Sequence, residues 1–284
     1  MLSDLFLKHR TNKMALEEFN SSNFFSKARI HVLLFIATFL TTYYVNGLWY
    51  SITIMTILLS HELGHFFMCR KYHVAATMPY FLPLPFPPFG TFGAVIKMKG
   101  LIPNKKALFD IGAAGPLMGL FFAIPAIIIG LNLSDVRPVP SDSSQYMGLG
   151  EPILFSFLSK LVFGHLPEGM DIYLHPVAFA GWAGLFVTAL NLLPIGQLDG
   201  GHIMYALLGK KSSIVYRIGI FLFCVIAIFM YPGWMVFAIL LLLFGFRHPS
   251  PTDEIATLDR KRKILGVILF IIFLISFTPV PLRF

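Results

Sequence analysis

The residues best suited to chemistry in this 284-residue chain are His61, Glu62 and His65, in the sequence HELGH. Residues four apart on a helix share one face, so two neutral imidazoles there can bind one metal ion. In the metalloprotease use of H-E-x-x-H, the glutamate does not bind the metal. It takes a proton from the water that the metal activates. The pattern therefore indicates a metal-dependent hydrolase.

The motif lies near the end of an apolar run that begins at Leu48. Two histidines and a glutamate inside an apolar helix are costly to leave without partners in lipid. We therefore expect these side chains to bind something, and a metal ion is the partner that their spacing predicts.

A second polar group follows a later apolar run, in the sequence NLLPIGQLDGGH from Asn191 to His202. Catalytic zinc usually has three protein ligands, and Asp199 is the best candidate for the third. Pro194 and the glycines would break the helix and let a carboxylate bend towards the histidines. Taken alone, the segment also fits a polar turn in which Asp199 caps a helix beginning near Gly201.

The elements that must position these residues are membrane helices. The composition is 56% hydrophobic and 13% charged with a mean hydropathy of +0.75, which is typical of a multi-spanning membrane protein. The net charge of +8 comes from residues that border apolar runs, so it indicates a lipid bilayer rather than nucleic acid as partner. Cys69 and Cys224 lie in apolar segments and are expected to be packing residues. No signal peptide or appended soluble domain is expected.

We predict an all-α polytopic fold with about six to seven transmembrane helices and a short β or re-entrant segment after the second. The two last candidate spans are short and are expected to be tilted or re-entrant. The candidates are Ala28 to Val45, Leu48 to Cys69, Lys106 to Leu131, Pro176 to Leu193, Ser213 to Met230, Trp234 to Phe246 and Ile264 to Thr278.

The basic residues predict the orientation. With seven spans and a cytoplasmic N-terminus, all 22 Lys and Arg except Arg137, Lys160 and Arg283 lie on the cytoplasmic side. His61 then lies roughly 20 Å into the second span, inside the bilayer and towards the cytoplasm. Asp199 falls on the same side, just past the end of the fourth span.

Other segments carry weaker signals. The five prolines between Met78 and Gly90 exclude a helix, and either a surface loop or a re-entrant segment fits them. Thr91 to Lys99 is strand-like; it would either hold an extended peptide at its edge or simply close the loop as a hairpin. Asp110 is expected to be a polar anchor, and Pro152 to Leu161 an amphipathic surface helix. Gly112 to Gly119 offers small residues for close helix contact.

The HELGH motif paired with N-L-L-P-I-G-Q-L-D-G-G resembles the site-2 protease family of intramembrane zinc metalloproteases. The resemblance extends to GTFGA at Gly90 and GAAGP at Gly112, and covers roughly Leu48 to Tyr205. It implies that His61, His65 and Asp199 bind one Zn²⁺, that Glu62 is the base and that Asn191 positions the substrate carbonyl or its oxyanion. It further implies hydrolysis of a peptide bond in or near the transmembrane segment of a membrane protein, usually a single-span one. The PDZ and CBS domains of some members are not expected here.

Residues 1–27 are predicted to be a cytoplasmic segment and 28–284 one membrane domain, with a catalytic core of about 48–205, in the cell membrane. Two alternatives remain. A zinc transporter of the ZIP type also carries H-E-x-x-H on a membrane helix, although the spare His31 and His202 are not expected to face the site. A catalytically idle relative that only binds membrane helices would have no need of the complete set of motif residues.

Overall fold

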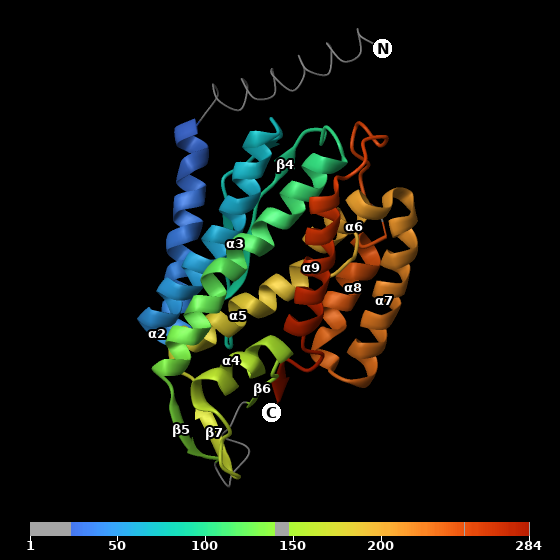
Figure 1. The fold of residues 1–284 in the computed structure, drawn as a ribbon. Helices are drawn as coiled ribbons and strands as arrows, with labels where there is room; N and C mark the ends of the chain where they lie inside the picture. The colour runs from blue at the N-terminus through green and yellow to red at the C-terminus, as the bar shows by residue number, and fades with distance from the viewer. Residues whose placement is uncertain (1–23, 140–147, 247, 284) are drawn as a thin grey trace.

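The computed structural model describes residues 24–139, 148–246 and 248–283, so most of the predicted N-terminal segment lies outside the described residues. Its helices run mainly along one direction, and α5 crosses the others obliquely (Figure 1). The α-helices are α2 (Phe24–Lys71), α3 (Lys105–Asn132), α4 (Ile153–Phe163), α5 (Pro176–Asn191), α6 (Asp199–Leu208), α7 (Ser212–Phe229), α8 (Met235–Phe244) and α9 (Arg260–Ser276).

The α2 segment is a pair of helices that reverses at Gly47, which has a positive φ of 80°. Glycine adopts this conformation readily because it has no Cβ. The hydroxyls of Thr42 and Ser51 lie 2.7 Å apart, and Ser51 also donates to the Phe39 carbonyl, so the two halves are joined close to the turn. The first two predicted spans are therefore antiparallel helices.

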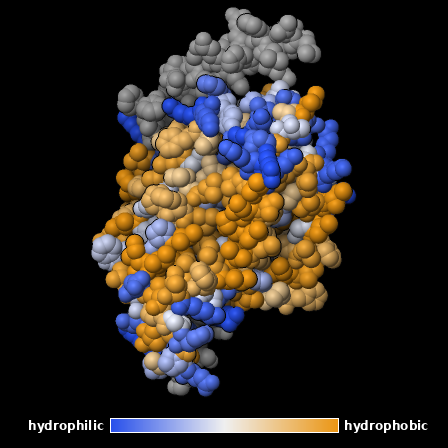
Figure 2. All heavy atoms as spheres, viewed as in Figure 1, coloured by the Kyte–Doolittle hydropathy of each residue, from blue (hydrophilic) through white to orange (hydrophobic). Residues whose placement is uncertain are grey.

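Each of the seven predicted apolar stretches lies on a helix. In the part of the chain that the structure describes, three helical segments are long and apolar enough to cross a membrane, namely Arg29–Lys71, Lys105–Asn132 and Asp199–Phe229. Large apolar side chains face outwards, including Phe121 at 67% and Val236 at 71% exposure. Figure 2 shows these apolar residues as a broad band between two hydrophilic ends. The chain is thus a membrane protein, while the count of seven spans stays a prediction.

Short antiparallel strand pairs lie in the segments that connect the helices. Two pairs, β1–β4 and β2–β3, lie between α2 and α3, and the pairs β5–β7 and β6–β8 lie at the end opposite to α6. The strands and short 3₁₀ helices are β1 (Ala75–Ala76), β2 (Tyr80–Pro83), β3 (Thr91–Val95), β4 (Met98–Lys99), β5 (Asp135–Pro138), β6 (Gly148–Leu149), β7 (Met170–Tyr173), β8 (Leu282–Arg283), η2 (Gly209–Lys211) and η3 (Pro232–Trp234).

The proline-rich segment is non-helical as predicted, but it contains the strand β2, which the prolines did not suggest. Its far end is held by the turn of α2. The side chains of Thr41, Asn46 and Tyr50 donate hydrogen bonds to the carbonyls of Gly90, Pro88 and Phe89. Whether this segment re-enters the bilayer stays a prediction.

The predicted strand from Thr91 to Lys99 forms, but in two parts. β3 pairs with β2, whereas β4 pairs with β1, so the chain changes partner at Ile96 and Lys97. Because this pair has only two strands, one edge of β3 has no partner strand among the described residues.

Helix α3 is the centre of the bundle and packs against α2, α5 and α6. Its start is tied to α9 by Asp110, which accepts two hydrogen bonds from Arg262 and one from Tyr72. This ion pair gives Asp110 the anchoring role that was predicted. The predicted surface helix also forms, as α4, with Ile153, Phe157 and Leu161 exposed along one face.

Candidate functional site

The two motif histidines lie one turn apart on the second half of α2. His61 and His65 are 4% and 7% exposed, and Glu62 beside them is 5% exposed. This burial follows from the apolar run that carries the motif and from the packing of α3 against it. Three groups that prefer water are therefore enclosed in the protein interior, where polar groups need partners.

Asp199 meets the two histidines at the start of α6. Its Oδ2 atom lies 3.2 Å from His61 Nε2 and 3.2 Å from His65 Nε2, and the two Nε2 atoms are 3.2 Å apart. The three atoms thus form an equilateral triangle. Ligand atoms bound tetrahedrally to zinc at about 2.1 Å would lie about 3.4 Å apart. The spacing therefore fits one zinc ion bound by all three side chains.

Hydrogen bonding also favours a cation here. Nδ1 of His65 lies 2.8 Å from the Ile111 carbonyl, which can only accept, so Nδ1 carries the proton and Nε2 of a neutral ring presents a lone pair. Asp199 Oδ2 is buried without a hydrogen-bond donor. Lone pairs that converge in this way repel one another unless a positive ion lies between them. Two imidazoles and a carboxylate, with the other ring nitrogen of one imidazole bonded to a backbone carbonyl, are typical of a zinc site.

Small residues on α3 make room for the imidazoles. A Cβ atom on Gly115 would lie 2.0 Å from His65 Nε2, and one on Gly119 would lie 3.1 Å from His61 Nδ1. A Cβ on Gly112 would come within 2.8 Å of the His202 side chain. The predicted close contact along Gly112 to Gly119 is therefore a contact with the site itself.

The break between α5 and α6 brings Asp199 into place. α5 ends at Asn191, three residues before Pro194, and Gly196 has a positive φ of 53°. A Cβ on Gly200 would lie only 2.0 Å from the Leu192 carbonyl oxygen, so this tight turn requires glycine. At the end of α5, the amide nitrogen of Asn191 lies 3.2 Å from His61 Nε2, which places Asn191 beside the triangle as well.

A cavity of about 190 Å³ opens beside these residues. Its walls come from four separate parts of the chain, which include the edge strand and the first turns of α6. The lining residues are His61, Glu62, His65, Ala94, Val95, Ile96, Met98, Ile111, Asn191, Gln197, Leu198, Asp199 and His202. A small peptide segment in this cavity would therefore contact the motif residues and β3 together.

Comparison with known proteins decides the family. The model of peptidase family M50 matches residues 49–226, which include both polar motifs. The chain belongs to peptidase family M50. This result confirms the resemblance to site-2 proteases.

Curated relatives of this M50 chain include plant proteins. Probable zinc metalloprotease EGY1, chloroplastic, from Arabidopsis thaliana is 28% identical over 231 residues, which are 80% of this chain and 42% of that protein. Probable zinc metalloprotease EGY2, chloroplastic, from Oryza sativa subsp. indica is 31% identical over 252 residues, which are 84% and 44%. The chain thus spans less than half the length of these relatives.

Among solved structures, the Site-2 Protease from Methanocaldococcus jannaschii is similar to this M50 chain. The match has 20% sequence identity and a TM-score of 0.35, and it covers 81% of this chain and 93% of that chain.

The structure thus brings together all five residues predicted for the M50 site. It also corrects the expectation for His202, which lines the cavity although it was not expected to face the site. The sequence carried a signal that went unused, since His202 follows Asp199 by three residues and falls on the same face of a helix. His248, whose Nε2 atom lies 2.6 Å from His202 Nδ1, had no such signal.

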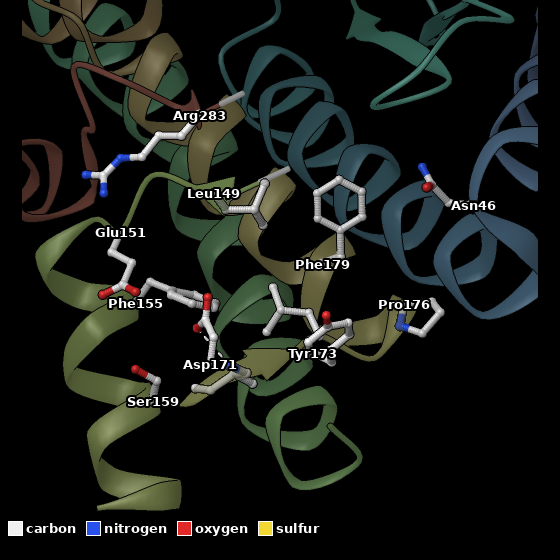
Figure 3. Close-up of a pocket in the computed structure, with 13 residues that line it drawn as sticks. Asn46, Leu149, Glu151, Phe155, Ser159, Asp171, Tyr173, Pro176, Phe179 and Arg283 are labelled. Carbon is white, nitrogen blue, oxygen red and sulfur yellow. Dashed lines mark hydrogen bonds between the residues drawn. The ribbon is translucent and has the colours of Figure 1, made fainter. Parts of the chain in front are cut away.

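A larger cavity of about 600 Å³ lies at the opposite end, between α4, β7 and the start of α5 (Figure 3). Phe155 and Phe179 face it from two helices, and charged residues such as Glu151 and Arg283 stand at its border. None of the motif residues lines it. We therefore assign the candidate chemistry to the smaller cavity.

Proposed function

We propose that this protein is an intramembrane zinc metalloprotease, which hydrolyses a peptide bond in or near the transmembrane segment of a membrane protein. The observation that carries this proposal is the triangle of His61, His65 and Asp199 atoms with 3.2 Å edges, beside Glu62, on an apolar helix. Family M50 membership and the zinc metalloprotease relatives support it.

In this proposal, His61, His65 and Asp199 hold one Zn²⁺. Zinc in such a site supplies Lewis acidity, which makes water more acidic and a carbonyl more electrophilic. Glu62 accepts a proton from the water that attacks the scissile carbonyl carbon. It then returns a proton to the leaving nitrogen as the carbon–nitrogen bond breaks, so one water is consumed for each bond cleaved. The Asn191 amide orients the carbonyl oxygen as negative charge develops on it.

The edge strand β3 is the proposed binding element for the substrate. A helical substrate hides its carbonyls in hydrogen bonds, so it must unwind before cleavage. An extended peptide added to the free edge of β3 would be held by backbone hydrogen bonds. Ala94 and Val95 line the same cavity as Glu62, so this edge would present the peptide to the catalytic residues.

We propose a single-span membrane protein as the substrate class, which is what the resemblance to site-2 proteases implies. The basic residues at the α6 end support an orientation in which that end, with the site and the N-terminus, faces the cytoplasm. The cell membrane is our proposed location, whereas the plant relatives are named as chloroplastic proteins.

Cleavage of a single-span test protein by the purified chain in liposomes checks the proposal. We expect Glu62→Gln to keep its zinc but to lose cleavage by at least about 100-fold, because proton transfer is removed. Glu168→Gln, on an exposed loop, is the matched control. A chelator should stop cleavage and added Zn²⁺ should restore it. Full cleavage by zinc-loaded Glu62→Gln would exclude this mechanism.

A zinc carrier needs further metal ligands along its path. In the described part of the chain, His61, His65 and Asp199 are the single group of three such side chains close enough to share an ion. This observation favours the protease over the transporter. Zinc uptake into the same liposomes would reverse that preference.

A further inference from the structure

His202 is a third buried histidine, besides His61 and His65, in the 190 Å³ cavity beside the motif residues, called the motif cavity below. It lies one turn after Asp199 on α6, is 6% exposed and lines the same cavity as Glu62. Its Nδ1 atom lies 2.6 Å from Nε2 of His248, a short hydrogen bond between two imidazoles. Two polar rings are rarely enclosed together unless their contact is needed, since burying each of them costs free energy.

His248 belongs to the segment between α8 and α9, and this segment is held in place. The His248 ring stacks on Tyr205 at 4.6 Å between ring centres and 15° between planes. The Tyr205 hydroxyl donates to Glu254 farther along the segment, and the backbone of Thr252 donates to Ile102. The segment therefore offers His202 a fixed partner rather than a mobile one.

The contact leaves one nitrogen of His202 available. Nδ1 is hydrogen-bonded to His248. Nε2 makes no hydrogen bond to the described residues, yet it does not belong to the fully buried polar atoms that lack a partner. Nε2 therefore reaches open space, and the space that His202 lines is the motif cavity. Burial lowers the pKa of His248 to about 3, so this ring is neutral near pH 7 and the pair shares a single hydrogen bond.

We propose that His202 contacts the backbone of the bound peptide through Nε2, and that His248 is a positioning residue that fixes the His202 ring for this contact. The proposal rests on the protease function proposed above. It adds a substrate-binding group on α6, whereas β3 provides residues on another wall of the same cavity. A role as a fourth metal ligand is disfavoured because the group of three that can share an ion does not include His202.

The test uses phenylalanine, which keeps an aromatic ring at the position but has neither of the imidazole nitrogens. We expect His202→Phe to keep one zinc per chain and to cleave the single-span test protein about 10- to 100-fold more slowly, as for the loss of one preorganised hydrogen-bonding group. His248→Phe keeps an aromatic ring to stack on Tyr205 and should lose less. His248→Gln should restore part of that loss because its amide can bond to His202. His165→Phe, exposed at the opposite end, is the matched control.

The double variant distinguishes positioning from a general structural effect. If His248 acts through His202, then His202→Phe with His248→Phe should cleave no more slowly than His202→Phe alone. Additive losses would overturn the positioning role. Loss of zinc from His202→Phe, or an unchanged cleavage rate, would overturn the substrate contact. If the wild type cleaves in a Glu62-dependent way while His202→Phe is unaffected, this inference alone fails; absence of wild-type cleavage would overturn both proposals.

Discussion

At the scale of single residues, the glycines of α3 leave the space that the histidines of the site occupy. A metal ligand needs both a donor atom and the space to aim it. Gly115 faces His65 and Gly119 faces His61, each at a distance that a side chain would occupy. The small-residue surface that allows close helix packing in membranes is used here to seat two imidazoles.

This arrangement makes a graded prediction for zinc binding. Gly115→Ala would place a Cβ 2.0 Å from His65 Nε2, so the imidazole must move and we expect zinc affinity to fall at least about 10-fold. Gly119→Ala would place its Cβ 3.1 Å from His61 Nδ1, and the loss should be smaller. Competition with a chelator, followed as zinc per chain, measures both. Equal affinities for Gly115→Ala and the wild type would contradict the assignment of His65 as a ligand.

Which residues meet could be predicted where the rule is local. The spacing of His61 and His65 predicted that they share one face of a helix, and Pro194 predicted a helix break before Asp199. His248 could not be predicted, because its contact with His202 depends on where the chain returns after α8. No short-range pattern encodes that return. His202 lies between these cases, since its spacing from Asp199 was readable but its direction depended on how α6 packs.

At the scale of elements, β3 connects the fold to the proposed chemistry. Its residues are few and its pairing is limited to β2, so one edge is free beside the cavity. An edge strand is a ready template for another extended chain. The hydrogen bonds from α2 to the end of the proline-rich segment hold the β2–β3 pair in place for this purpose.

A substrate paired with β3 should show the repeat of a strand. Phe92 is 73% exposed and offers a site for Phe92→Cys in the Glu62→Gln background. Single cysteines along the substrate should cross-link to it with a period of two residues, because alternate side chains of a strand face the same way. Phe229→Cys, exposed on α7, is the control. A period of three to four residues would mean that the substrate binds as a helix and would exclude edge pairing.

The helices could be predicted as elements because the backbone N–H and C=O groups of an apolar run in lipid must hydrogen-bond to one another, and a helix achieves this within one segment. The strands could be predicted only in part. Prolines in β2 argue against a central strand, yet Pro83 lies at its end in a two-stranded pair, where a missing donor is tolerated. The split of the next strand into β3 and β4 depends on two different partners, which the sequence of that strand does not specify.

At the scale of the whole molecule, the two ends differ. The end that holds the site carries basic residues at the ends of helices, among them Lys71 of α2, Lys105 of α3 and Lys210 of η2. The opposite end carries the 600 Å³ cavity and the β5–β7 pair. An apolar band separates them (Figure 2). The arrangement in space agrees with the charge pattern from which the predicted topology was counted. The spans that decide the count are the short α8 and α9.

Three exposed positions test that count. The helices between Glu168 and Ser250 are α5, α6, α7 and α8, of which α5, α7 and α8 are predicted spans, and Ser250 and Arg283 are separated by α9 alone, the fourth predicted span in this part of the chain. If all four helices cross the bilayer, Glu168→Cys and Arg283→Cys must react with an impermeant maleimide from one side and Ser250→Cys from the other. The pairing of β6 with β8 supports this result, because it places Arg283 beside Gly148 at the end opposite to the site.

Sealed vesicles of a chain with Cys69→Ala and Cys224→Ala provide the measurement, and detergent-opened vesicles the control in which all three react. Labelling of Ser250→Cys and Arg283→Cys from the same side would mean that α9 does not cross. Labelling of Glu168→Cys and Ser250→Cys from the same side would mean that an even number of helices crosses between them, and Asp199 would then have to reach the histidines from a different topology.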